Sequence, residues 1–335
     1  MKKRWSFLLL VLAIASTGFF LFKKIHPAPG HTLFDAVYDD QPVQLTVETD
    51  LAALFEKKAG DGYLPAVFTF QKTACPVLCL DGKVKARGVF RKATCSFPPL
   101  KLRVEDEVLR KQGLKERKTL KLVTHCDSDP AFDQLVYKEY LAFKIYSLLT
   151  ERSFRVQLAN VRYVDAKKEL ADIERPGFLI ENDNELADRL GGRIWKEDYG
   201  PVKGVDKEQY KLFTVFQFMV GNTDWNVSGQ HNAVVIVPKK KNAGVRMPFP
   251  VPYDFDFCGL VDAPYAVPHY SIPIEDVRER FFQWRGKQDE DFSEVFALFA
   301  KNKAAILKMC REFEPLRMKN AGPMPMPTSR IFSKC

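Results

Sequence analysis

The chain has 335 residues, 46% of them hydrophobic, and carries a formal net charge of +9. This length and composition exclude a disordered or fibrous protein and allow one large or two modest globular domains. Lysine and arginine are spread along the whole chain, and no base-reading motif occurs. We therefore expect an anionic ligand or a membrane surface as partner, and no nucleic acid.

The N-terminus predicts a membrane anchor or a signal segment. Three basic residues precede an apolar run from Trp5 to Phe22, and two lysines follow it. The run reaches the lower limit for crossing a bilayer, so residues 1–25 are interpreted as a signal anchor or a cleaved signal peptide, with the anchor favoured. Residues 26–32 form a linker. The rest of the chain is then expected outside the cytoplasm, in the cell envelope or periplasm, or exported if cleavage occurs.

Beyond the linker, the apolar pattern changes from strands to helices. Period-two alternation predicts a β-rich block with strands at 65–70, 83–88, 100–104 and 119–124. A helical repeat follows at 133–151, and then come strands at 155–165 and 177–180. The remaining pattern predicts a strand at 232–237 and helices at 184–189, 207–220 and, for the most part, 275–316.

This order predicts an α+β chain with a two-lobed, protein-kinase-like fold. The kinase-like domain is expected over residues 33–316, with a β-rich N-lobe at about 33–180 and a helix-rich C-lobe at about 181–316. Residues 317–335 form a tail rich in proline and methionine. A nucleotide is expected in the cleft between the lobes.

Seven cysteines allow either disulfides or a metal site. In an exported domain, Cys75 and Cys79 could pair with each other, or with Cys95 and Cys126. The spacing alone does not decide the connectivity. A zinc site built from the same cysteines and His125 is a less regular alternative.

An acid and two amides follow the predicted helix 207–220. Asp224 lies in a polar turn and could be aimed at a substrate hydroxyl as a catalytic acid or base. Asn232 begins the next strand and could coordinate magnesium through its amide oxygen. Asn226 is the alternative amide, and His231 is expected to be structural.

A second acidic pair, Asp254 and Asp256, lies among aromatic residues that suggest burial. Side chains two positions apart share a face in an extended segment, so both carboxylates could reach one metal ion. If the chain turns after Asp254, only one would. Buried carboxylates need a cation, and we expect Asp254 as the main ligand and Asp256 as the second.

A lysine and a glutamate further upstream could hold phosphates. Lys101 lies in a predicted strand, and Glu139 on the long helix is its expected ion-pair partner. Lys121, in the next strand, competes with Lys101 for the same role. The sequence contains no glycine-rich phosphate loop.

In their order along the chain, these segments resemble the CotH kinase family, the atypical kinases similar to spore coat protein H, and more distantly the HipA type. The resemblance covers roughly residues 80–290 and depends on the segments 87–91, 98–103, 120–126, 138–142, 177–181, 221–224, 231–232 and 253–256. It implies ATP and Mg²⁺ as cofactors. It also implies Asp224 as catalytic acid or base, Asn232 and Asp254 as metal ligands, Lys101 and Arg87 in nucleotide binding, and Glu181 near the adenine.

Two functions follow as expectations. The first is an atypical kinase that transfers the γ-phosphate of ATP to a hydroxyl of an envelope protein or a small molecule. The alternative is a pseudokinase-like envelope protein that binds without turnover. A metal-dependent hydrolase would need more histidine or aspartate ligands near one site than this chain offers.

Overall fold

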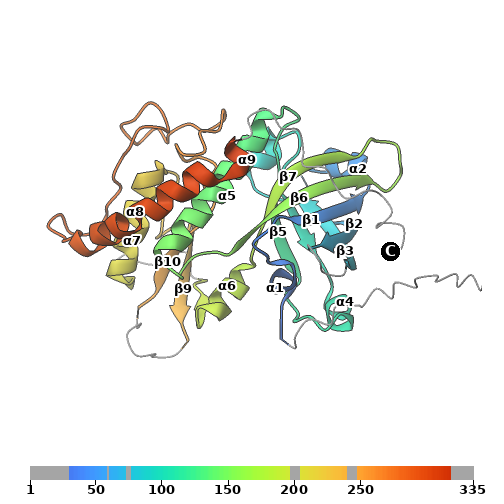
Figure 1. Cartoon of the computed structure of the whole chain (residues 1–335), viewed down its shortest axis with the longest axis horizontal. Coiled ribbons are helices and arrows are strands. Elements are labelled where there is room, and N and C mark those ends of the chain that lie inside the picture. The colour runs from blue at the N-terminus through green and yellow to red at the C-terminus, as the bar shows by residue number, and fades with distance from the viewer. Residues whose placement is uncertain (1–29, 59, 73–76, 197–203, 240–246, 318–335) are drawn as a thin grey trace, which may run out of the picture.

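The protein is described here from a computed structural model, which covers residues 30–58, 60–72, 77–196, 204–239 and 247–317. The predicted anchor or signal segment and most of the predicted tail lie outside the described residues. Within them, seven strands form a barrel, and a three-stranded sheet and the longer helices lie beside it (Figure 1). The described residues include no helix both long enough and apolar enough to cross a membrane.

The barrel closes through one parallel contact. Its strands follow the order β1-β2-β3-β4-β5-β7-β6, and every neighbouring pair is antiparallel except β1 and β6. The register of that parallel pair runs from Val43 opposite Ala159 to Thr49 opposite Asp165. The strands are β1 (Val43–Thr49), β2 (Leu64–Gln71), β3 (Leu78–Ala86), β4 (Leu100–Arg103), β5 (Thr119–Val123), β6 (Val156–Asp165) and β7 (Ile173–Ile180).

The expectation of a two-lobed protein-kinase-like fold is wrong, because the strands form a closed barrel instead of an open sheet. Alternation of apolar residues predicts that a strand has one buried face, but it does not say which strand edges meet. Here the first strand pairs with one more than a hundred residues later along the chain. Closure leaves no unpaired edge in the barrel.

Apolar side chains that alternate along these strands fill the barrel interior. Leu45, Phe68, Val84, Leu100 and Leu122 are all buried there. Three short helices add apolar side chains to this core: α1 (Leu33–Val37), α2 (Leu51–Glu56) and α4 (Asp106–Lys111). A fourth short helix, α3 (Phe90–Thr94), connects β3 to β4.

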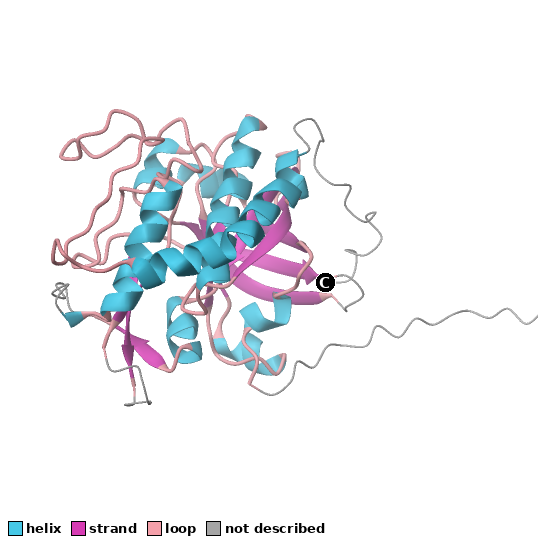
Figure 2. Cartoon of the chain, turned by 60° about the vertical axis from the view of Figure 1, so that its left-hand side comes forward, coloured by secondary structure: helices cyan, strands magenta, loops and turns pink. Residues whose placement is uncertain are grey.

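The remaining elements form a second layer around a separate core. The helices are α5 (Ala131–Leu149), α6 (Asp183–Arg189), α7 (Lys207–Val220), α8 (Ser293–Glu312) and α9 (Glu314–Arg317). The small sheet has the order β10 (Phe249–Pro252), β9 (Ala233–Pro238), β8 (Gly192–Ile194). Helix α5 packs between strand β7 and helix α8, and Figure 2 shows the helices gathered beside the barrel strands.

Helix α7 confirms the prediction for residues 207–220 at both ends. The predicted helix at 275–316 is wrong for residues 275–292, which form a loop before α8. In that loop, Arg280 donates a hydrogen bond to the Met219 carbonyl and Gln283 donates one to the Thr223 carbonyl. Both side chains thus hydrogen-bond to the C-terminal end of α7 and the turn after it. These tertiary contacts override the local helical pattern of residues 275–292.

Candidate functional site

A basic cavity opens along one wall of the barrel. Its volume is about 600 Å³, which lies within the range of small-molecule sites. Five lysines or arginines and one aspartate contribute to its lining, which consists of Asp61, Lys85, Ala86, Arg87, Gly88, Val89, Lys92, Ala93, Lys101 and Lys121. We call this cavity the basic groove. The excess of cations makes it suited to a polyanion.

Three of these cations form a ladder across adjacent strands. Lys85 on β3 lies opposite Lys101 on β4, which lies opposite Lys121 on β5. Directly paired residues point to the same face of a sheet. The next positions in register, among them Ala86 and Leu100, are buried in the barrel. The lysines therefore point outward into the groove because the apolar residues point inward.

The three lysines differ in their ion pairs. Lys85 Nζ lies 3.3 Å from the Asp61 carboxylate, and Lys121 Nζ lies 2.5 Å from that of Asp183. In the described part of the chain, Lys101 Nζ makes no ion pair or hydrogen bond. Burial lowers the pKa of Lys121 against the opposing attraction of Asp183. Lys101 thus presents an uncompensated ammonium group to a ligand.

Arg87 connects the groove to a second cluster. It follows strand β3, and its main-chain N–H donates to the Pro99 carbonyl at 2.7 Å. Burial lowers the pKa of Arg87, and the nearby carboxylate of Asp254 opposes that shift. The guanidinium group therefore lies within electrostatic reach of Asp254 while also lining the groove.

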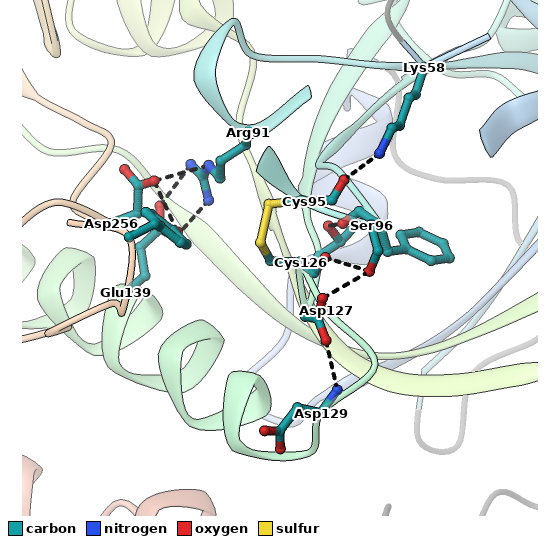
Figure 3. The surroundings of a disulfide bond; sticks show 12 residues. Lys58, Arg91, Cys95, Ser96, Cys126, Asp127, Asp129, Glu139 and Asp256 are labelled. Atoms are coloured by element: carbon teal, nitrogen blue, oxygen red, sulfur yellow. Dashed lines mark hydrogen bonds and ion pairs between the residues drawn. A yellow bond between two sulfur atoms is a disulfide. The ribbon is translucent and has the colours of Figure 1, made fainter. Parts of the chain in front are cut away.

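Three carboxylates surround Arg91 in this second cluster. Arg91 lies on α3, Glu139 on α5, and Asp254 and Asp256 on the segment after β10. The guanidinium Nη1 lies 3.1 Å from Glu139 Oε2, Nη2 lies 2.6 Å from Asp254 Oδ1, and Nε lies 3.2 Å from Asp256 Oδ2. Figure 3 shows Arg91 directed at Glu139 and Asp256. We call these four residues the Arg91 cluster.

The surroundings shift the pKa values of the three carboxylates of the Arg91 cluster in different directions. Burial raises the pKa of Asp256 well above its usual range and also raises that of Glu139. Burial would raise the pKa of Asp254 too, but the Arg91 and Arg87 guanidinium groups outweigh it and lower that pKa. The Tyr265 hydroxyl donates to Asp256 Oδ2 at 3.1 Å. The charged form is thus favoured more strongly at Asp254 than at Asp256.

Asp224 is held in a turn at the end of α7. The helix ends at Gly221 with φ of 70°, a left-handed conformation that favours glycine. The Asp224 N–H donates to Asn222 Oδ1 at 3.0 Å. His231 Nε2 lies 2.8 Å from Asp224 Oδ1, and Asn232 Nδ2 donates to Asp224 Oδ2 at 2.9 Å. Both carboxylate oxygens are therefore oriented by neighbours.

The β9–β10 hairpin brings this turn to the Arg91 cluster. Asn232 immediately precedes β9, and Tyr253 immediately follows β10. Because the two strands are antiparallel, these ends meet, and the Tyr253 N–H donates to the Asn232 carbonyl at 3.2 Å. The hydrogen bond that His231 donates to Asp224 and the charges of Asp224 and Asp254 raise the pKa of His231. Asp224 and Asp254 thus belong to one site.

The predicted magnesium ligands point in different directions. Asp254 and Asp256 direct their carboxylates to Arg91, whereas Asn232 directs its amide nitrogen to Asp224. The alternative, Asn226, accepts from the Gly229 N–H with its amide oxygen. Among the described residues, no group of three or more histidine, cysteine or acidic side chains is suited to hold a metal ion. As arranged, the donor set does not fit Mg²⁺.

Two other predicted contacts take a different form. Glu139 pairs with Arg91, and not with Lys101 as expected. Glu181 is fully buried, and its carboxylate lies within 3.0 Å of Arg155 and 2.5 Å of Arg189. Glu181 therefore forms two internal ion pairs, which connect the end of β7 to the start of β6 and to α6.

The chain turns at Asp254, whose φ is 61°. Asp254 and Asp256 nevertheless both reach the guanidinium group of Arg91.

The sequence reasoning missed Arg91 and Lys85 as site residues. Arg91 ends the 87–91 segment, and its only local signal is a basic residue in a short helix. Lys85 could have been found from the alternation, since it lies between the apolar Val84 and Ala86 in the predicted strand 83–88 and so points to the outer face. Its register against Lys101 depends on the strand pairing.

A disulfide between Cys95 and Cys126 anchors the helix that carries Arg91. It joins the C-terminal end of α3 to the segment after β5, across 31 positions of sequence. Figure 3 shows it beside the Arg91 cluster. It rules out a zinc site that uses these two thiols. Cys258 is a buried free cysteine, and Cys310 is a half-buried one.

Comparison with known proteins assigns no family: no protein-family model matches the chain, and no curated protein matches it.

Proposed function

We propose that this protein is a phosphotransferase that binds ATP in the basic groove and transfers its γ-phosphoryl group to a hydroxyl of a protein or small molecule. The lysine ladder carries this proposal, because it lines the groove with cations suited to phosphate oxygens. Lys121 of the ladder lies within electrostatic reach of Asp254, which belongs to the same site as the Asp224 turn. Catalysis of phosphoryl transfer consists almost entirely of positioning and charge stabilisation.

The proposed roles follow from the contacts. Lys101, Lys121 and Arg87 neutralise the phosphate oxygens as charge develops on the leaving diphosphate. Asp224 accepts the proton of the acceptor hydroxyl while the new O–P bond forms and the bond to the β-phosphate oxygen breaks. His231 and Asn232 hold the Asp224 carboxylate in one orientation. The disulfide is consistent with an extracytoplasmic location, as is the N-terminal apolar run.

A second candidate is a protein that binds the same anion without turnover. It is favoured by one observation: both oxygens of Asp224 already have hydrogen-bond partners. In that case the Asp224 turn is structural, and the groove alone has a ligand.

Labelled ATP tests the two candidates on the full chain. Asp224→Asn keeps the shape of the side chain and removes its charge, so we expect phosphoryl transfer to fall by roughly 10²–10⁴-fold, with ATP affinity retained. Asp172→Asn is the matched control, because Asp172 pairs with Arg162 outside the groove. ATP binding without transfer in the wild type would favour the second candidate. Absence of ATP binding would refute both.

A further inference from the structure

Arg91 occupies the place where three carboxylates from distant segments meet. Its side chain is 8% exposed, those of Glu139 and Asp256 are 4% and 7% exposed, and that of Asp254 is 25% exposed. Buried carboxylates require a cation or a proton. Each of the three guanidinium nitrogens faces a carboxylate oxygen, so every nitrogen of the arginine has an acidic partner here.

The position of Arg91 is secured from its own helix. The Cys95 N–H donates to the Arg91 carbonyl at 2.9 Å, and Cys95 is bonded to Cys126. The guanidinium group is therefore carried on a helix that is covalently attached to the barrel. A solvent-exposed arginine with rotational freedom would not hold three acids in this way.

A divalent metal at the same point would be superfluous. Mg²⁺ requires near-octahedral oxygen ligands, usually one or two carboxylates together with phosphate oxygens and water. Here Asp254 Oδ1 and Asp256 Oδ2 both face Arg91, and a metal ion beside them would meet the positive charge of Arg91 and of Arg87. The guanidinium group of Arg91, which is part of the chain, already supplies the positive charge that a metal ion would bring.

We infer that Arg91 is a built-in cation that replaces a divalent metal ion at Glu139, Asp254 and Asp256, so that the basic groove binds polyphosphate without a metal. The first half of this inference, the replacement of a metal ion by Arg91, is argued from the contacts of Arg91 alone. The second half, the binding of polyphosphate without a metal, rests on the proposed function. Arg91 is a positioning residue in this scheme, since it acts through the carboxylates that it holds.

Mn²⁺ binding by the full-length protein, followed by electron paramagnetic resonance, tests the first half. The wild type should leave Mn²⁺ free in solution. Arg91→Gln should create a Mn²⁺ site from the three released carboxylates, and adding Asp254→Asn to it should abolish that site. Arg278→Gln is the control, because Arg278 pairs with Asp276 and Asp262 on the surface, and it should create no site.

Wild-type Mn²⁺ binding that Asp254→Asn abolishes would overturn the inference. So would a folded Arg91→Gln protein, verified by its melting curve, that gains no Mn²⁺ site. If that variant does not fold, Arg91→Lys provides the second comparison: it retains one charge but not the three-way fork, and weak Mn²⁺ binding is then expected. Its failure to bind Mn²⁺ when folded would count against the inference.

ATP affinity in the presence of Mg²⁺ and in EDTA tests the second half, with a fluorescent ATP analogue as the probe. We expect the two dissociation constants of the wild type to agree within about twofold. A loss of roughly tenfold or more in EDTA would overturn metal independence and leave the proposed function intact. No binding in either condition would refute the proposed function, while the Mn²⁺ result would still decide the role of Arg91.

Discussion

His125, which immediately precedes a disulfide cysteine, is held neutral by its surroundings. Its side chain is 3% exposed and packs against Phe97, with a ring-centroid separation of 4.6 Å, and near Tyr163. Its Nδ1 atom has no hydrogen-bond partner among the described residues. Burial lowers the pKa of His125 to about 3, and the charge of Arg175 adds to the shift.

This histidine should make the protein sensitive to acid. The pKa in the folded state lies below the ordinary value of 6.5, so below pH 6.5 only the unfolded chain takes up the proton. Stability is therefore retained above pH 6.5 and lost as pH falls toward 3, at up to about 1.4 kcal/mol per pH unit. His125→Phe should flatten this slope in urea unfolding between pH 7 and pH 4.5.

His269→Gln is the control for that measurement, since His269 is exposed and its ring hydrogen-bonds to the exposed Ser271. Its slope should equal that of the wild type. An unchanged slope in His125→Phe would show that other groups account for the acid response. Phenylalanine is larger than histidine, so the substitution leaves no cavity behind.

The lysine ladder of β3, β4 and β5 is unfavourable without a ligand. Like charges placed directly opposite each other on adjacent strands repel. Asp61 and Asp183 offset the charges of Lys85 and Lys121, but within the described chain nothing offsets that of Lys101. An arrangement that costs stability and faces a cavity is typical of a binding site.

Lys101→Gln should therefore separate stability from binding. We expect the free energy of unfolding to stay constant or rise by about 0.2–1 kcal/mol, because repulsion is removed. ATP affinity should fall by roughly tenfold or more, because a charge-assisted phosphate contact is lost. Thermal unfolding and titration with a fluorescent ATP analogue measure the two effects.

Lys83→Gln is the matched control on strand β3. Lys83 pairs with Glu105 and does not line the groove, so its substitution should leave ATP affinity unchanged. Equal losses of affinity in both variants would indicate a general charge effect. A clear loss of stability in Lys101→Gln would contradict the idea that the ladder is strained.

Across the whole molecule, the site depends on contacts between segments that are far apart in the chain. The groove comes from strands β3 to β5, Asp61 and the α3 region. Arg91 comes from α3, Glu139 from α5, Asp224 from the turn before β9, and Asp254 from the segment after β10. The Cys95–Cys126 disulfide links α3 to the barrel. Loss of that link should affect both stability and the geometry of the site.

The double variant Cys95→Ser/Cys126→Ser should unfold more easily. Closing a loop of this length lowers the entropy of the unfolded chain, and we expect the free energy of unfolding to fall by about 3–4 kcal/mol. Urea unfolding under non-reducing conditions measures this loss. Cys310→Ser is the control, because Cys310 is free and half-buried, and it should change stability little. A stability equal to that of the wild type would show that the disulfide contributes nothing.

Much of the local structure could be predicted from the sequence. Helix α7 was predicted at both ends, and strands β5 and β6 were predicted within one residue at each end, because apolar periodicity and capping residues are local. The acids Asp224, Asp254 and Asp256 were identified as a set from their turns and aromatic neighbours. Their meeting in one site follows from the antiparallel β9–β10 pair, which the sequence pattern did not contain.

The sequence by itself determined which residues alternate, which helices form, and which polar residues lie in turns. The tertiary structure alone decided that the barrel closes through β1 and β6, that Lys85, Lys101 and Lys121 stand in one row, and that Glu139 pairs with Arg91. The physical reason is that patterning specifies the buried face of an element, whereas strand register and ion-pair partners depend on which elements meet. Strand register and ion-pair partners, which depend on the tertiary structure, therefore decided both the barrel fold and the charged site.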